Sequence, residues 1–295
     1  MSAPPRLVLG ADTLCWHLRL ETGDITLEGV LDEAADAGAE YVQLTLHHAR
    51  ERSADDLRRL AGRAGELGLR ILASGDFLGG ARFGDEPSVA AERVQTWLER
   101  ALALDSPILR VTSGFYRADL ATRPDAIEAE RRWVIAALLA SVPAARAAGV
   151  TLALENHADF SVSEYRSIVE SVGDDHVRVF LDVINPVAAL EDPVPVVRAL
   201  APLSVGGHVK DFELESILTE GGYHRRGFSV LYRYPGEGAA SLAAIWAALA
   251  DGLDGRELPI AVEGLDNRAD VRDQGERLRG SFEHLRGLAP APAGA

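Results

Sequence analysis

Short apolar runs rich in β-branched residues alternate with longer amphipathic segments along the whole chain, and this alternation occurs eight times. The apolar runs are predicted strands, at 6–11, 41–46, 69–74, 107–112, 150–155, 177–182, 203–209 and 258–263. The segments between them have helical spacing of apolar residues, as at 26–38, 53–68, 125–149 and 239–250. Alternation of this kind is typical of parallel α/β folds.

Eight strand and helix units in about 280 residues predict a parallel (β/α)8 barrel, the TIM barrel fold, as one α/β domain. The hydrophobic content of 47% is sufficient for the core of such a barrel. An open doubly wound sheet is the alternative, but the sequence after the first predicted strand, LGADTLCW, lacks the glycine fingerprint of that fold. We expect the barrel to span residues 1–288 and the Pro-rich tail, 289–295, to be disordered.

Residues at the ends of the predicted helices support their boundaries. Glycines that suit a left-handed C-terminal cap stand at Gly38, Gly68 and Gly149. Thr26 and Ser53 are predicted N-caps. Pro143 lies inside the long predicted helix at 125–149, so we expect a kink there or a division into two helices.

The charge and the cysteine content exclude several classes of protein. The chain has 30 basic and 45 acidic residues, and the net charge of −15 disfavours nucleic acid and acidic membrane surfaces as partners. No run resembles a signal peptide or reaches the roughly 18 apolar residues of a membrane span, so we expect a soluble, cytoplasmic protein. The single cysteine, Cys15, excludes an internal disulfide and a cysteine-rich zinc site. Any metal must therefore be bound by His, Asp and Glu.

Polar residues at the ends of the last four predicted strands form the candidate site. They are Glu155, Asp182, His208 and Glu263, each the first acid or histidine after an apolar run. Because the carboxyl ends of barrel strands meet at one mouth, these side chains are expected to lie together. Three carboxylates in one cavity repel one another unless a cation lies between them. The pattern therefore predicts a divalent metal site, although His208 alone would more often be a structural histidine.

The spacing along the chain agrees with this interpretation. Glu155, Asp182 and His208 are separated by 27 and 26 residues, about one β/α unit each, whereas His208 and Glu263 are separated by 55. The surplus lies at 211–238, which we interpret as a long substrate-covering loop. Its arginines, Arg225, Arg226 and Arg233, are candidates for contact with substrate.

Three further positions are weaker candidates for substrate contact. Trp16 follows the first strand, where an indole suits the apolar face of a sugar, but core packing is an equal alternative. His47 precedes His48 after the second strand, and two adjacent histidines cannot both point into the mouth. Lys210 either pairs with Asp211 or reaches the site.

The motifs VTLALENH, FLDVINP, GGHVKD and IAVEGL, with YPGEG before the last unit, resemble those of the xylose isomerase-like TIM barrel superfamily. The resemblance follows the unit order of the whole chain and is specific over residues 150–264. It is closest to the sugar and inosose isomerases, epimerases and dehydratases. It implies that one divalent ion is bound by Glu155, Asp182, His208 and Glu263, with manganese expected and magnesium or cobalt as alternatives.

The resemblance also implies a chemistry for a small carbohydrate substrate. A carbonyl and a neighbouring hydroxyl bind the ion, one carboxylate removes the α-proton and a second delivers a proton, which gives isomerisation or epimerisation. Glu155 and Glu263 are the expected acid/base pair. His157 is expected to bind a hydroxyl or support a ligand. Asn185 stands where some epimerases of the family have histidine, so its contact with substrate must differ.

Other functions fit parts of the same pattern. A metal-dependent lyase or dehydratase acting by β-elimination on a keto-sugar, keto-glycoside or inosose would use the same site. The endonucleases of the superfamily have more histidines in a trinuclear zinc pattern, and the negative charge argues against DNA. A non-catalytic scaffold is the remaining alternative. Barrels of this kind often form dimers or tetramers, so a homo-oligomer is compatible with the resemblance.

Overall fold

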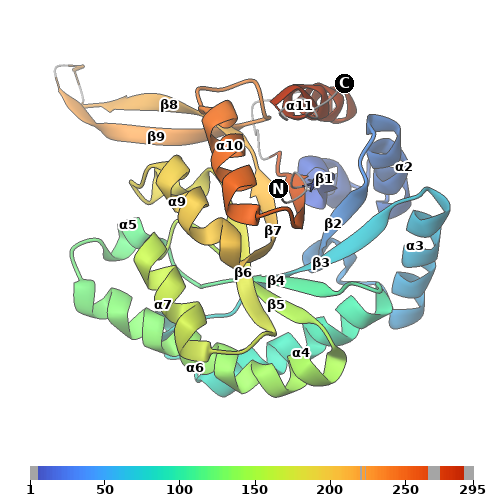
Figure 1. Ribbon diagram of the computed structural model, residues 1–295, viewed down its shortest axis with the longest axis horizontal. Helices are drawn as coiled ribbons and strands as arrows, with labels where there is room; N and C mark the ends of the chain where they lie inside the picture. The colour runs from blue at the N-terminus through green and yellow to red at the C-terminus, as the bar shows by residue number, and fades with distance from the viewer. Residues whose placement is uncertain (1–5, 220, 223, 265–272, 289–295) are drawn as a thin grey trace.

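The computed structural model describes residues 6–219, 221–222, 224–264 and 273–288. Eight parallel strands close a barrel in the order β1-β10-β7-β6-β5-β4-β3-β2 (Figure 1). The strands are β1 Arg6–Asp12, β2 Tyr41–Thr45, β3 Arg70–Phe77, β4 Ile108–Thr112, β5 Thr151–Glu155, β6 Val177–Asp182, β7 Ser204–Val209 and β10 Glu257–Val262. The predicted (β/α)8 barrel is confirmed. The tail at 289–295 lies outside the described residues.

Helices surround the barrel on its outer side (Figure 1). The longer ones are α2 Leu27–Ala37, α3 Ala54–Glu66, α4 Pro87–Ala103, α6 Pro124–Ala148, α7 Val162–Val172, α9 Pro193–Leu200, α10 Leu242–Leu253 and α11 Gln274–Leu288. Short helices occur in the loops, at α1 His17–Thr22, α5 Arg117–Leu120, α8 Asn185–Ala188, η1 Thr13–Trp16, η2 Leu46–Ala49, η3 Ala81–Phe83 and η4 Ala201–Leu203. Within the described part of the chain, no helix is both long enough and apolar enough to span a membrane.

The predicted helix caps are present. The Thr26 side chain accepts a hydrogen bond from the Gly29 amide, and Ser53 forms a reciprocal capping box with Asp56. Gly38 and Gly149 end α2 and α6 with φ of 88° and 66°, a conformation that glycine adopts without steric cost.

Of the two outcomes expected at Pro143, division of the long helix is wrong, because α6 is a single helix of 25 residues. Proline removes the hydrogen bond to the carbonyl four residues earlier, at Leu139, and its ring crowds that carbonyl. Leu139 lies on the exposed side of α6, with 48% of its surface accessible, where solvent can satisfy such a carbonyl.

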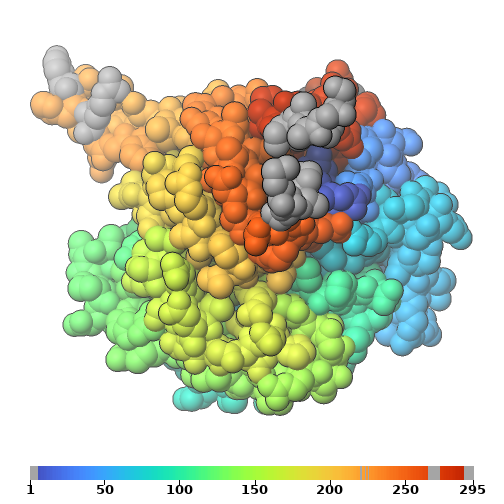
Figure 2. Space-filling model, in the orientation of Figure 1, coloured from blue at the N-terminus to red at the C-terminus, as the bar shows by residue number. Residues whose placement is uncertain are grey.

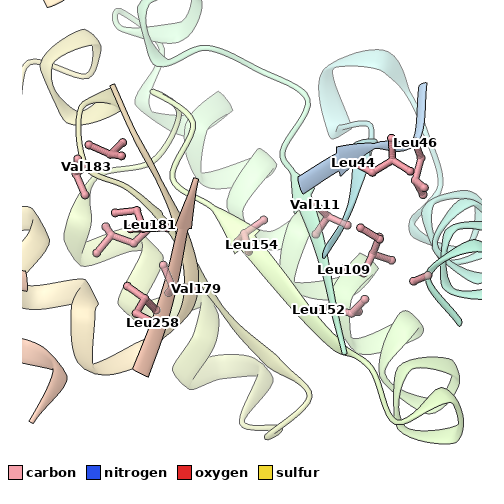
Figure 3. Close-up of a cluster of buried hydrophobic side chains, with 14 of the residues drawn as sticks. Leu44, Leu46, Leu109, Val111, Leu152, Leu154, Val179, Leu181, Val183 and Leu258 are labelled. Carbon is pink, nitrogen blue, oxygen red and sulfur yellow. The ribbon is translucent and has the colours of Figure 1, made fainter. Parts of the chain in front are cut away.

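The strands are buried on both faces. Leu109, Val111, Leu152 and Leu154 belong to the cluster between the barrel and its helices (Figure 3). A separate cluster of Val8, Tyr41, Leu72 and Ala261 comes from four adjacent strands, β1, β2, β3 and β10. Because side chains alternate between the faces of a strand, the residues between the outward ones point into the barrel. This alternation directs the polar residues of the site toward one interior.

Residues 211–218 and 225–233 form the two strands of a hairpin, where a loop was predicted. Strand β8, Asp211–Leu218, pairs antiparallel with β9, Arg225–Arg233, and the hairpin projects from the body of the molecule (Figures 1 and 2). The alternation of Phe212 and Leu214 with the acids Glu213 and Glu215 has the period of a strand. That alternation was the sequence signal for the hairpin.

Candidate active site and metal centre

Four side chains predicted to bind metal lie together at the barrel mouth. Glu155 ends β5, Asp182 ends β6, His208 lies in β7 and Glu263 follows β10. The Nδ1 atom of His208 is 2.9 Å from Glu155 Oε1, 3.5 Å from Glu263 Oε1 and 3.8 Å from Asp182 Oδ2. None of the four side chains is more than 5% exposed. One imidazole nitrogen is thus faced by three carboxylates in the buried interior of the barrel.

The backbone after β6 orients Asp182. Its Oδ1 atom accepts hydrogen bonds from the amides of Ile184 and Asn185, both at 2.8 Å. The side-chain amide of Asn156 holds the backbone of the same residue. It accepts a hydrogen bond from Asp182 N at 2.8 Å and donates one to Asp182 O at 2.7 Å. With Oδ1 occupied in this way, Oδ2 is the oxygen directed to the centre.

Gln43 and Asp12 hold the other side of the His208 ring. Nε2 of His208 lies 2.7 Å from the Gln43 amide nitrogen and 3.2 Å from Asp12 Oδ2. Oε1 of Gln43 is buried without a hydrogen-bond partner. Exchanging the two amide atoms, which are nearly equal in shape, lets this oxygen accept from Nε2–H. With Nε2–H held there, loss of the proton on Nδ1 leaves its lone pair facing the three carboxylates, which is the tautomer that a metal ligand requires.

Two buried cations balance part of this negative charge. Arg110 of β4 donates to Glu155 Oε2 through Nε at 2.9 Å and also through Nη2. Lys210 donates to Asp182 Oδ2 at 2.6 Å and to Glu263 Oε2. Lys210 is 1% exposed and is the only lysine among the 30 Lys and Arg residues of the chain. Of the two predicted roles of Lys210, the structure therefore has the lysine reaching the site, where it forms ion pairs with two of the candidate ligands.

The cations keep the two glutamates ionised. Burial alone would raise their pKa values, but the charge of Arg110 and the hydrogen bond with His208 hold the pKa of Glu155 well below its usual range. Lys210 and His208 similarly lower the pKa of Glu263 to about 2. Both side chains are carboxylates at neutral pH, so each is ready to bind a cation or accept a proton.

The remaining members of the site respond to the same charges. Burial is the largest cause of the raised pKa of Asp182. Burial would lower the pKa of His208, but the carboxylates of Glu263, Asp12 and Glu155 raise it to about 10. A proton thus occupies the imidazole that a metal would otherwise bind, and metal binding would release it.

Comparison with known proteins places the chain in a family. A sequence model described as the xylose isomerase-like TIM barrel matches residues 31–286. The chain belongs to the xylose isomerase-like TIM barrel family. A curated relative, 3-oxo-isoapionate decarboxylase of Pectobacterium atrosepticum, is 25% identical over 210 residues, which are 70% of this chain and 69% of the relative.

Solved structures share the fold. The IolI protein with a zinc atom has a TM-score of 0.73 and 16% identity, covering 96% of this chain and 99% of its own. D-psicose 3-epimerase from Clostridium cellulolyticum H10, solved with D-tagatose, has a TM-score of 0.71 and 15% identity, covering 96% and 99%.

The donor set in this member of the family suits a divalent metal ion. One ligand atom each from Glu155, Asp182 and His208 lie within 4.8 Å of one another, and Glu263 Oε1 faces the same His208 nitrogen. Three carboxylates and one imidazole match the preferences of Mn²⁺, Mg²⁺ and Co²⁺. The residues present therefore fit such an ion.

Aromatic side chains border the centre. The Tyr232 ring lies 4.5 Å from Lys210 Nζ, and its hydroxyl donates to Asn185 Oδ1 at 3.2 Å. His157 is half-buried, with its ring 5.7 Å from that of Phe77 and 5.3 Å from that of Tyr116. Nδ1 of His157 is buried without a hydrogen-bond partner. The predicted substrate contacts Asn185 and His157 thus lie beside aromatic surfaces.

Three other predicted contacts lie elsewhere. Trp16 is fully buried and donates to Glu33 at 2.7 Å, so its indole is part of the core and presents no face to a ligand. His47 is half-exposed and lies 3.3 Å from Glu21. Arg226 is exposed on the projecting hairpin.

Sequence reasoning missed three polar residues of the site. Asp12 follows the predicted first strand directly and obeys the same strand-end rule as the candidate ligands. Gln43 and Arg110 lie inside predicted strands. The sequence signal for these two residues is that each interrupts an apolar run. A polar side chain at such a position points into the barrel only if it has a partner there.

Proposed function

We propose that the protein is a divalent-metal-dependent isomerase or epimerase that acts on a sugar, ketose or inosose. The observation that carries the proposal is the ring of carboxylates around His208 Nδ1, with Glu155 and Glu263 at 2.9 and 3.5 Å. In this proposal Glu155, Asp182, His208 and Glu263 hold one ion, with Mn²⁺ preferred over Mg²⁺ or Co²⁺. The ion would stabilise negative charge that develops on a substrate carbonyl oxygen.

The two glutamates are the proposed acid/base pair. They reach the cavity from β5 and β10, which are not neighbours in the barrel, so they can approach a substrate from different sides. Their lowered pKa values keep both of them ionised, so either can accept a proton at the start of the reaction. Glu155 or Glu263 removes the proton next to the carbonyl. The other glutamate then delivers a proton, and Lys210, hydrogen-bonded to Glu263 Oε2, orients that carboxylate.

The border of the site suits a polyhydroxylated ring or chain. Tyr232, Tyr116 and Phe77 offer aromatic surfaces of the kind that pack against the C–H face of a sugar. Nδ1 of His157 and the amide of Asn185 are the polar groups beside those surfaces. These two groups are the proposed contacts for substrate hydroxyls, and their positions would determine which sugar is preferred.

A lyase is the second candidate. The curated relative, named as a decarboxylase, favours it, because loss of carbon dioxide from a 3-keto acid passes through the same enolate as proton removal. The buried cations Arg110 and Lys210 would suit a substrate carboxylate. β-Elimination from a keto-sugar or keto-glycoside would also start from this enolate. The site thus supports enolate formation, and the leaving group decides the reaction class.

The deciding experiment follows Mn²⁺-loaded protein with ketoses, inososes, keto-glycosides and 3-keto sugar acids in deuterium oxide. An isomerase or epimerase gives a new isomer with deuterium at the carbon next to the carbonyl, whereas a lyase releases carbon dioxide or an eliminated group. Glu155→Gln and Glu263→Gln are each expected to lower kcat by several orders of magnitude. Glu257→Gln, at the exposed end of β10, is the matched control. Full turnover in metal-free protein, or small effects of both glutamine variants, would overturn the proposal.

A further inference from the structure

A second group of possible ligands lies outside the barrel centre, on the loops that follow β1 and β2. We call His17, Glu21 and His48 the rim cluster. His17 begins α1 and Glu21 lies one turn later, a spacing that places both on one helix face. His48 belongs to η2, and its Nε2 atom is 2.9 Å from His17 Nδ1. Two segments 31 residues apart thus bring two imidazole nitrogens into contact.

A neighbouring threonine orients His48. Thr13 Oγ1 accepts a hydrogen bond from the Thr45 amide at 3.1 Å and lies 2.9 Å from His48 Nδ1. When Nδ1–H of His48 donates to this oxygen, the Nε2 lone pair points at His17. Metal-binding histidines have their second ring nitrogen fixed in the same way. The two facing nitrogens then need either a shared proton or a cation between them.

We propose that the rim cluster binds a second divalent ion, of the zinc class, independently of the ion at the barrel centre. One ligand atom each from His17, Glu21 and His48 all lie within 4.8 Å of one another. Two nitrogens bound tetrahedrally at about 2.0–2.1 Å are about 3.3 Å apart, so the pair at 2.9 Å needs a shift of only a few tenths of an ångström. Two histidines and one carboxylate leave a coordination position for water.

The chemistry of the rim cluster differs from that of the barrel centre. Two imidazoles favour Zn²⁺, Co²⁺ or Ni²⁺, whereas three carboxylates and one imidazole also suit Mn²⁺ and Mg²⁺. Arg50 Nη1 contacts Glu21 Oε1 at 3.2 Å and His47 Nε2 at 3.1 Å, so the ion must share Glu21 with a guanidinium. We therefore expect the rim ion to bind more weakly than a structural zinc in an all-cysteine site.

An ion at the rim would connect α1 to η2. Thr13, which orients His48, follows Asp12 directly, and Asp12 contacts His208 at 3.2 Å. The rim ion would thus stabilise the segment that supports the barrel histidine. This role does not depend on which reaction the protein catalyses.

The test is metal content by mass spectrometry after metal-free protein is loaded with Zn²⁺ and passed through a desalting column. We expect two ions per chain in the parent protein, and one in His17→Gln, in His48→Gln and in His208→Ala. His176→Gln, whose side chain contacts Asp174 and neither centre, is the matched control and should retain two. Circular dichroism checks that each variant is folded, and half-buried His17 is the safer substitution if His48→Gln unfolds.

The results separate the two centres. Loss of one ion in both rim variants, with the other retained, supports the rim site. A single ion that His208→Ala removes, with no change in the rim variants, overturns the rim site and leaves the barrel centre intact. Two ions in the parent protein that persist in His17→Gln and His48→Gln also overturn it. A rim ion retained in His208→Ala would show that the two sites bind independently.

Discussion

Nε2 of His208 lies 2.7 Å from the amide nitrogen of Gln43, although the two residues are 165 positions apart in the chain. The contact crosses the barrel interior from β7 to β2, and it holds the ring so that Nδ1 faces the carboxylates. The Gln43 side chain is 0% exposed, so this support is rigid and dry. The position of the candidate metal ligand is therefore set by a strand that contributes no predicted ligand.

Gln43→Leu should weaken binding of Mn²⁺ about 10- to 100-fold, because supporting partners of a ligating histidine contribute that much to metal affinity. The substitution keeps most of the side-chain volume and removes the hydrogen bond to Nε2. Isothermal titration of metal-free protein with Mn²⁺ measures the change. Gln95→Leu, an exposed glutamine of α4, is the control and should leave the affinity unchanged. Equal affinity in both variants would mean that Gln43 only fills space.

Lys210→Met should destabilise the metal-free protein far more than the metal-loaded protein. Lys210 is the cation that contacts Asp182 and Glu263, and removing one partner of a buried ion pair costs about 3–5 kcal/mol. A bound Mn²⁺ would replace the lost charge and restore much of this stability. Urea unfolding of the parent protein and of Lys210→Met, each with and without Mn²⁺, gives the four free energies of unfolding.

The control for this prediction is Arg58→Met, which removes an exposed cation of α3 and should change the free energy of unfolding by less than about 0.5 kcal/mol. If Lys210→Met lowers the stability equally in the metal-free and loaded forms, the lysine contributes packing rather than charge balance.

The ionised Glu33 side chain should stabilise the folded protein at neutral pH and lose this effect at acidic pH. Burial would raise its pKa, but hydrogen bonds from Arg19 and Trp16 lower it below the usual value for a glutamate. Because the pKa is lower in the folded protein, the stabilisation is present above the pKa of the unfolded chain and is lost as the pH falls through the folded pKa. Glu33→Gln should therefore cost about 1 kcal/mol at neutral pH and less below pH of about 4.

Chemical unfolding of the parent and Glu33→Gln proteins across pH measures this difference. Glu66→Gln, with 70% of its side chain exposed, provides the control. A constant difference between the parent and Glu33→Gln proteins at every pH would assign the effect to geometry instead of charge.

The barrel was predictable from sequence because its strands are buried on both faces and are therefore short continuous apolar runs. The candidate ligands were also predictable, since Glu155, Asp182 and Glu263 interrupt that pattern at strand ends. The contact between His208 and Gln43 was not, because only closure of the barrel brings β7 opposite β2. The roles of these residues and the cytoplasmic location stay predictions.

The hairpin was missed for a different reason. Strands β8 and β9 form a separate two-stranded sheet, and in β8 the apolar residues Phe212 and Leu214 alternate with Glu213 and Glu215 instead of forming a continuous run. Glycines near its turn, such as Gly222 and Gly227, favoured a loop. A test for alternation with a period of two residues across 211–233 would have distinguished a hairpin from a loop.

Gly206→Ala should disturb His208 through Phe180. A Cβ atom at position 206 would lie 2.7 Å from Cε2 of Phe180, too close for any contact between carbon atoms. The Phe180 ring packs edge-on against His208, with centroids 4.8 Å apart and planes at 74°. The added methyl group must therefore displace the ring that packs against the histidine. We expect a loss of about 1–3 kcal/mol in the free energy of unfolding and weaker Mn²⁺ binding.

A second substitution distinguishes this route from general strain. Combining Gly206→Ala with Phe180→Leu removes the ring edge that the new methyl group meets. The double variant should therefore lose less Mn²⁺ affinity than the sum of the losses in the two single variants. Gly62→Ala, in the middle of α3 with no atom within 4 Å of the new Cβ, is the control and should stabilise the protein by about 0.5–1 kcal/mol. Strictly additive losses would show that Gly206 and Phe180 influence the metal site separately.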